Sequence, residues 1–190
     1  MGEEEWELAD RFQRVPIALI CAATLSHTSH SRMMSLPAIS SVEETRRGEF
    51  LVSTDPARLD LDVIHGFLTN CYWAKGIPRE VVARSIEHSL CFGVYDSSAQ
   101  VGFARVISDF TTIAYVGDVF VLDTHRGRGL GKWLMDNITR HPALQNLRRW
   151  ILTTRDAHGL YSQVGFTPVK SPERFMELHR PDIYEIRKAT

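Results

Sequence analysis

Apolar side chains recur at helical spacing in several stretches of this chain and at strand spacing in others. In the clearest helical case, Leu130, Leu134 and Ile138 share one face, and the pattern stops before Pro142. The helices predicted in this way span about residues 60–70, 78–88, 129–141 and 157–164.

Runs of β-branched and aromatic residues predict strands at residues 50–52, 90–95, 101–108, 113–122 and 149–153. Short turns at residues 96–98 and 109–111 join the second, third and fourth of these strands, which predicts an antiparallel meander. Two weaker strand patterns lie within residues 166–186. Strands interleaved with helices in this order predict an α+β fold of mixed α/β layers.

The N-terminal part of the chain has a different composition. Residues 26–49 are rich in Ser, Thr, His and charged side chains, which is typical of a linker. We therefore expect residues 1–48 to be an extension or linker and residues 49–190 to form one globular domain. An apolar run at residues 15–25 follows an acidic start at residues 3–5, which argues against a signal peptide.

Charge is balanced in this chain, with 22 Lys and Arg against 23 Asp and Glu. This balance gives no global attraction to nucleic acid or to a membrane, so neither is an expected partner. Three widely spaced cysteines, an odd number, favour reduced thiols in the cytoplasm over a disulfide framework. His27 and His30 have no neighbouring Cys or carboxylate, so no metal site is expected.

A glycine-rich run lies between the predicted strand that ends near Leu122 and the helix that follows it. The N-terminus of a helix offers unpaired N–H groups and the positive end of the helix dipole to an anion. Glycines let the backbone approach phosphate oxygens, and basic side chains add positive charge at the rim. The predicted pyrophosphate site consists of Arg126, Gly127, Arg128, Gly129, Leu130, Gly131 and Lys132.

The spacing of this run excludes two common nucleotide motifs. A Walker A loop requires a glycine where Arg126 stands and Ser or Thr where Trp133 stands. A Rossmann fingerprint requires a glycine at Lys132 and a position after the first strand of a parallel unit. The run therefore indicates a different phosphate ligand.

The run resembles the pyrophosphate motif Gln/Arg-x-x-Gly-x-Gly/Ala of the GNAT superfamily of acetyl-CoA-dependent N-acetyltransferases. A second signature of that superfamily, Ala-x-x-x-Tyr-x-x-x-Gly-Phe, is matched by Ala157, Tyr161, Gly165 and Phe166. The resemblance covers about residues 49–186. It implies a mixed, mostly antiparallel sheet that is flanked by helices and splayed between its fourth and fifth strands.

The resemblance also implies that the backbone of Val119, Phe120 and Val121 binds the pantetheine arm and the acetyl carbonyl. Two positions depart from the superfamily pattern. Thr154 stands where many members have Asn, and Tyr115 stands where many have a basic Glu on the fourth strand. The roles of those Asn and Glu residues are not carried over to this chain.

Acetyl transfer to an amine requires a proton acceptor for the ammonium group and a proton donor for the leaving thiolate. Tyr161 is the expected acid, and the alternative is a core aromatic packed near Phe166. Asp118, beside a Gly117 that suggests a β-bulge, is the expected base, and the alternative is an anchor paired with an arginine. His158 or water are further options for the base.

Tyr72 and Trp73 fall between the two predicted N-terminal helices, a region that varies with substrate in the superfamily. They are candidates to line an amine pocket through cation–π contact, with core packing as the alternative.

These features predict an N-acetyltransferase that moves an acetyl group from acetyl-CoA to a primary amine by direct attack. A small-molecule amine is the expected partner, and a homodimer is compatible with the chain. The alternative functions are a catalytically weak CoA-binding sensor or regulatory module and a nucleotide-binding protein.

Overall fold

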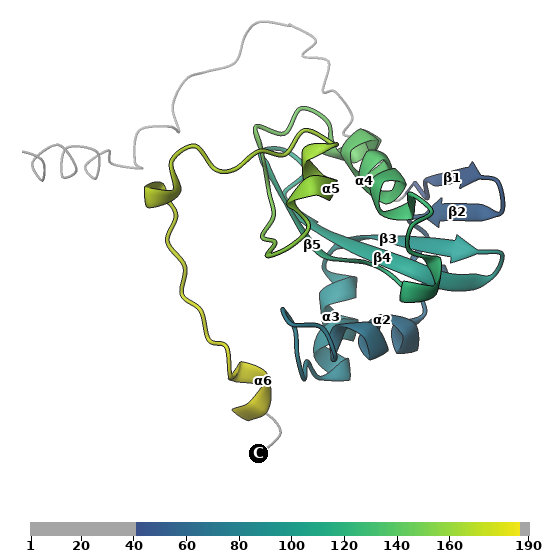
Figure 1. The fold of residues 1–190 in the computed structure, drawn as a ribbon, viewed down its shortest axis with the longest axis horizontal. Helices are drawn as coiled ribbons and strands as arrows, with labels where there is room; N and C mark the ends of the chain where they lie inside the picture. The colour runs from purple at the N-terminus through teal and green to yellow at the C-terminus, as the bar shows by residue number, and fades with distance from the viewer. Residues whose placement is uncertain (1–40, 187–190) are drawn as a thin grey trace, which may run out of the picture. The chain divides into compact units, whose positions relative to one another are not determined.

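One sheet of six strands organises residues 41–186, the part of the chain that the computed structural model describes (Figure 1). The strands lie side by side in sequence order, and every pair is antiparallel except β5 and β6, which are parallel. Their bounds are β1 Glu44–Arg47, β2 Phe50–Ser53, β3 Leu90–Asp96, β4 Ala99–Ser108, β5 Ile113–Val121 and β6 Arg149–Ile151. The mixed, mostly antiparallel sheet confirms the predicted fold class.

Helices cover both faces of this sheet. The helices α2 Leu61–Leu68 and α3 Arg79–Glu87 lie on one face, and α4 Leu130–Arg140 and α5 His158–Ser162 lie on the other (Figure 1). A last short helix, α6 Ile183–Ile186, ends the described chain. Single turns of 3-10 helix are η3 Pro56–Arg58, η4 Asp123–His125, η5 Pro142–Leu144 and η6 Pro172–Arg174.

Local signals in the sequence fix the starts of α2 and α3. The Asp60 carboxylate accepts the N–H groups of Asp62 and Val63 at 2.9 and 3.1 Å, which caps α2. Pro78 precedes α3, where a residue without an N–H group costs no hydrogen bond.

In the central strands β3, β4 and β5, side chains on opposite faces pack against one helical layer or the other. On the α4 side, Leu134 and Ile138 are completely buried against the sheet. On the α2 and α3 side, Ile64 and Phe103 are completely buried in a second cluster. Burial of each such side chain contributes roughly 1.5–3 kcal/mol.

The sheet opens between β5 and β6. These strands pair only from Ile113 to Tyr115, whereas β5 continues to Val121, so the predicted splay is confirmed. On its other edge, β5 has a bulge in its pairing with β4, at Asp118. Asp118 adopts a left-handed backbone conformation with φ of 55°.

Two predictions about the ends of the domain were wrong. Residues 44–47 form β1 instead of belonging to a linker; all four side chains are exposed, so no apolar alternation marked the strand. The strand patterns in residues 166–186 form no strand in the described chain. Three prolines interrupt that segment, and side chains such as Met176, 98% exposed, find no surface to cover. The apolar run at residues 15–25 and the pair of His27 and His30 lie outside the described residues.

Candidate functional site

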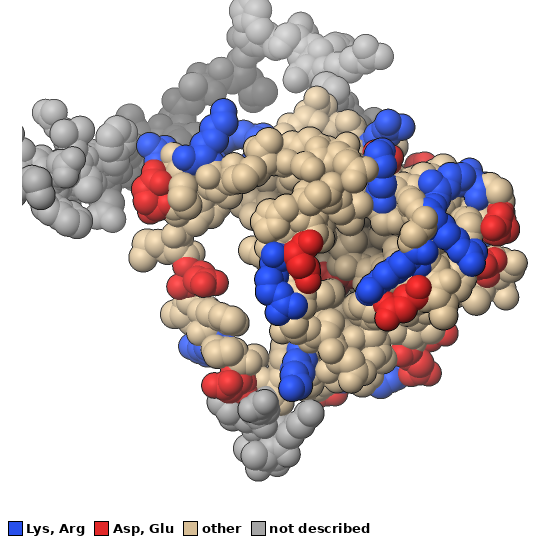
Figure 2. All heavy atoms as spheres, viewed as in Figure 1, with Lys and Arg blue, Asp and Glu red and all other residues tan. Residues whose placement is uncertain are grey.

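A cavity of about 1270 Å³ lies along β5 where β6 leaves it. Figure 2 shows this face hollowed, with basic and acidic side chains around the rim. The walls come from β5, the start of α4, the connection between α2 and α3, and the segment from β6 to α5. Eleven of the twelve residues predicted for catalysis and cofactor binding line it: Asp118, Val119, Phe120, Val121, Arg126, Gly127, Gly129, Leu130, Gly131, Lys132 and Tyr161.

The glycine-rich loop enters α4 through two left-handed residues, Gly127 and Gly129, with φ of 76° and 71°. Gly129 is the N-cap of α4, and it has no side chain to bond the N–H groups of the first turn. Those N–H groups and the positive end of the α4 dipole are therefore available to an anion in the cavity.

The three basic residues of this loop differ in their surroundings. Arg126 pairs with Asp123 at 2.9 Å, and Lys132 pairs with Asp136 at 2.6 Å. Arg128 does not line the cavity; its guanidinium lies over the Phe50 ring, 5.8 Å from the centroid. The Arg128 side chain thus lies outside the cavity that the other residues of the loop line.

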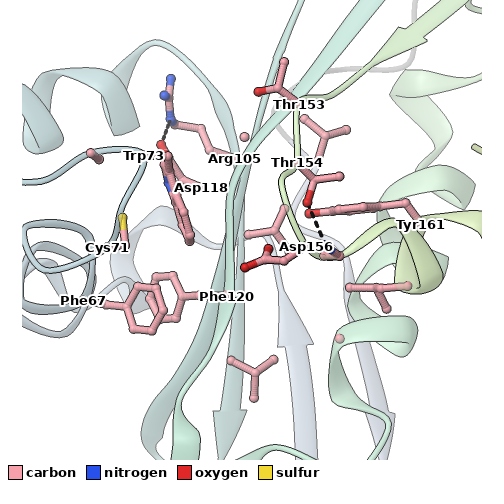
Figure 3. A pocket seen from close by; sticks show the side chains of 18 of the residues that line it. Phe67, Cys71, Trp73, Arg105, Asp118, Phe120, Thr153, Thr154, Asp156 and Tyr161 are labelled. Atoms are coloured by element: carbon pink, nitrogen blue, oxygen red, sulfur yellow. Dashed lines mark hydrogen bonds and ion pairs between the residues drawn. The ribbon is translucent and has the colours of Figure 1, made fainter. Parts of the chain in front are cut away.

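The bulge at Asp118 carries a polar network, of which the sequence suggested only a pairing of Asp118 with an arginine. The Asp118 carboxylate accepts a hydrogen bond from Arg105 Nε at 2.8 Å and another from Trp73 Nε1 at 3.3 Å (Figure 3). Arg105 also donates to Ser89 Oγ at 3.2 Å. The Asp118 and Arg105 side chains are only 13% and 18% exposed. This geometry favours the anchoring interpretation of Asp118, because its carboxylate is already engaged by two donors that hold the bulge.

Tyr161 points from α5 toward Thr154 and the gap beside β5 (Figure 3). Its ring packs edge-on against Phe166, with centroids 6.1 Å apart. Burial raises the pKa of the Tyr161 hydroxyl to about 12, and Tyr72 and Tyr115 add smaller contributions in the same direction. A phenol in this setting keeps its proton at neutral pH and can donate it. The core-packing and catalytic interpretations of Tyr161 are therefore compatible.

Both departures from the superfamily pattern lie in the cavity wall. The Tyr115 hydroxyl is 3.0 Å from Thr153 Oγ1, which links β5 to the segment after β6. Thr154 Oγ1 accepts the N–H of Ala157 at 3.0 Å, just before α5. Thr154 therefore helps to fix the start of the helix that carries Tyr161.

Tyr72 and Trp73 line the cavity and are 45% and 43% exposed. The Arg155 guanidinium stacks on the Tyr72 ring at 3.8 Å from its centroid, and the Arg155 N–H donates to the Tyr72 hydroxyl at 3.2 Å. One face of Tyr72 is thus already occupied by a cation, which an amine would have to displace. No local sequence pattern indicates this contact, since the two residues are 83 positions apart.

Residues 41–186 contain no cluster of three His, Cys, Asp or Glu side chains that could hold a metal ion. The same residues include no helix long and apolar enough to cross a membrane. Cys71 and Cys91 are both free thiols, and burial raises the pKa of Cys91 to about 12.

Comparison of the sequence with known proteins finds similarity to acetyltransferases. The profile of the acetyltransferase (GNAT) domain matches residues 87–168, which run from the end of α3 past α5. A protein of Gibberella zeae assigned as an acetyltransferase is 34% identical over 140 residues, covering 62% of this chain and 78% of that protein.

Solved structures agree with this match. A crystal structure from Xanthomonas campestris pv. campestris, assigned to the GNAT family of acetyltransferases, is 54% identical with a TM-score of 0.69; the comparison covers 71% of this chain and 96% of that one. A structure from Deinococcus radiodurans R1 is 21% identical with a TM-score of 0.58, covers 73% of this chain and 94% of that one, and shares the fold.

Proposed function

Because this chain belongs to the GNAT family of acetyltransferases, we propose that it moves an acetyl group from acetyl-CoA to a primary amine by direct attack. One observation carries the proposal. A single cavity is lined both by the glycine-rich start of α4 and by Tyr161. An anion site and a proton donor therefore face the same space.

The residues of the loop fit coenzyme A. The first-turn N–H groups of α4 have no side-chain cap, and Gly127 and Gly129 leave the backbone open to phosphate oxygens. Nothing lies within 4 Å of the place where a Cβ on Gly127 would stand, so this part of the cradle is open. Acetyl-CoA supplies an activated thioester when it is bound there. The chain itself supplies the anion site, the walls and the proton donor.

Beyond Tyr115, no strand of the described chain pairs with β5 on the side of β6. Backbone N–H groups at Val119 and Val121 are candidates to donate to an acetyl carbonyl oxygen. The Arg105–Asp118 pair fixes the bulge beside them. In this proposal Asp118 positions the strand, water accepts the proton of the amine, and Tyr161 Oη gives a proton to the departing sulfur.

The test is release of free thiol from acetyl-CoA in the presence of a panel of primary amines. We expect turnover with at least one amine, strongly reduced by Tyr161→Phe and retained by Asp118→Asn. A loss of the acidic limb of the pH profile in Asp118→Asn would instead assign Asp118 as the base. CoA binding without turnover across the panel would contradict the enzyme proposal and leave a CoA-binding regulatory module.

A further inference from the structure

We propose that Arg47 and Arg128 form a subsite for a phosphate monoester, the 3′-phosphate on the ribose of coenzyme A. This inference rests on the proposed function and adds a determinant that distinguishes the full cofactor from its dephosphorylated form. Arg47 lies at the end of β1, a strand that the sequence pattern had not predicted.

Arg47 is fixed directly beside the glycine-rich loop. Its Nη2 donates to the backbone carbonyl of Arg128 at 3.0 Å, and its guanidinium lies over the Trp133 ring, 4.7 Å from the centroid. Its Nη1 is 3.8 Å from the position that a Cβ on Gly129 would occupy. Arg128 lies over Phe50. Two aromatic rings and a carbonyl thus hold a pair of guanidinium groups next to the start of α4.

These two arginines have no acidic counter-charge in the described chain. Neither has a carboxylate of residues 41–186 within 4 Å, whereas Arg126 and Lys132 are each paired with an aspartate. Two neighbouring cations repel one another when nothing neutralises them. A dianion at this place would relieve that repulsion. Figure 2 shows basic side chains extending from the hollow toward the β1 and β2 end of this face.

The chemistry of coenzyme A provides such a dianion. Its 3′-phosphate is attached to the same ribose that carries the pyrophosphate, so it lies one sugar away from the group held by the loop. Arginine presents several N–H donors in a planar fork and binds phosphate oxygens in pairs. The guanidinium of Arg47, which adjoins Gly129, is placed to take this second phosphate.

The experiment is calorimetric titration of the full chain with coenzyme A and with dephospho-CoA, which lacks only the 3′-phosphate. We expect the wild-type protein to prefer coenzyme A by on the order of tenfold or more, the effect of a charge-assisted phosphate contact. Arg47→Gln keeps a donor for the Arg128 carbonyl but has no charge. It should lower the affinity for coenzyme A toward that for dephospho-CoA and leave the latter unchanged.

Arg46→Ala is the matched control, because Arg46 is the adjacent exposed arginine and alternates to the other side of β1. It should keep the wild-type preference. Equal wild-type affinity for the two ligands would overturn the subsite, and so would an Arg47→Gln variant that weakens both ligands equally. Failure of both ligands to bind the wild-type protein would contradict the proposed function itself.

Discussion

Tyr161 and Asp118 line one cavity, and their surroundings suit them to different roles. Asp118 is tied to Arg105 and Trp73, which hold the bulge in β5. Tyr161 keeps its proton because burial raises its pKa to about 12. The sequence identified both residues, but it left their roles open because the Arg105 and Trp73 contacts depend on the folded chain.

Replacing Tyr161 by Phe removes the proposed proton donor and keeps the ring against Phe166. We expect kcat to fall by about 10²-fold, within the usual contribution of a general acid, with little change in affinity for acetyl-CoA. The raised pKa keeps the hydroxyl protonated below about pH 10, so wild-type kcat should not decline on the alkaline side before that point. Steady-state kinetics from about pH 6 to 10 measure both effects. A Tyr161→Phe enzyme with wild-type kcat would remove the residue from the mechanism.

Removing the Asp118 carboxylate leaves the mostly buried Arg105 without its partner. Asp118→Ala should lower the free energy of unfolding by about 2–3 kcal/mol, since an unpaired buried charge is costly. The control is Asp62→Ala, because Asp62 pairs with Arg79 on the surface and is 82% exposed. That change should cost less than about 1 kcal/mol. Urea denaturation compares the two variants, and equal losses would show that the bulge pair is no more important than a surface pair.

At the scale of elements, hydrophobic periodicity and helix caps were sufficient to predict each element that buries one face. The helices α2, α3 and α4 and the meander of β3, β4 and β5 were predicted with ends close to those observed. β1 escaped prediction because its side chains are exposed and its pairing depends on β2. For the segment after Gly165 the error was the opposite: strands were predicted but none forms, since apolar residues there meet no partner strand.

Two glycines at the start of α4 are expected to respond in opposite ways, in fold stability, to substitution by alanine. Gly129 has φ of 71°, so Gly129→Ala should destabilise the fold by about 1–2 kcal/mol. A Cβ on Gly131 would meet only the Leu160 side chain, at an ordinary 3.5 Å. Gly131→Ala should therefore be neutral or stabilising by up to about 1 kcal/mol, because alanine favours a helix. Thermal or urea denaturation gives the signs, and destabilisation of equal size in both variants would refute this assignment of the helix start.

At the scale of the whole molecule, distant segments meet in ways that no local pattern reveals. The Arg47–Arg128 contact joins residues 81 positions apart, and the Tyr72–Arg155 contact joins residues 83 apart. The sequence motifs identified the loop that is proposed to hold the cofactor. They did not predict the shape of the cavity, the face of Tyr72 that Arg155 covers or the contribution of β1 to the proposed phosphate subsite. These features depend on how the whole sheet assembles.

Buried titratable groups on several elements set the pH range in which the fold is stable. Burial raises the pKa of Cys91, Tyr95 and Tyr161 to about 12, so the unfolded chain loses these protons at lower pH than the folded chain. The free energy of unfolding should therefore fall as pH rises above about 9. Burial lowers the pKa of His141, so stability should also fall as pH decreases below about 6.5.

Urea denaturation across this pH range measures the effect, and Tyr95→Phe is the control. The Tyr95 hydroxyl is buried without a hydrogen-bond partner among the described residues, so its removal should cost little at neutral pH. The variant should lose less stability than the wild-type protein above about pH 10. Identical alkaline losses in the two proteins would contradict the contribution assigned to Tyr95.

The central claim is that the loop from Arg126 to Lys132 binds acetyl-CoA. Calorimetric titration of the wild-type chain and of Gly129→Glu with acetyl-CoA tests it most directly, with Gly129→Ala as the control for backbone strain. We predict saturable binding at one site in the wild-type protein, weaker binding in Gly129→Ala, and no measurable binding in Gly129→Glu, whose carboxylate would repel the pyrophosphate. Wild-type affinity in Gly129→Glu would contradict the account.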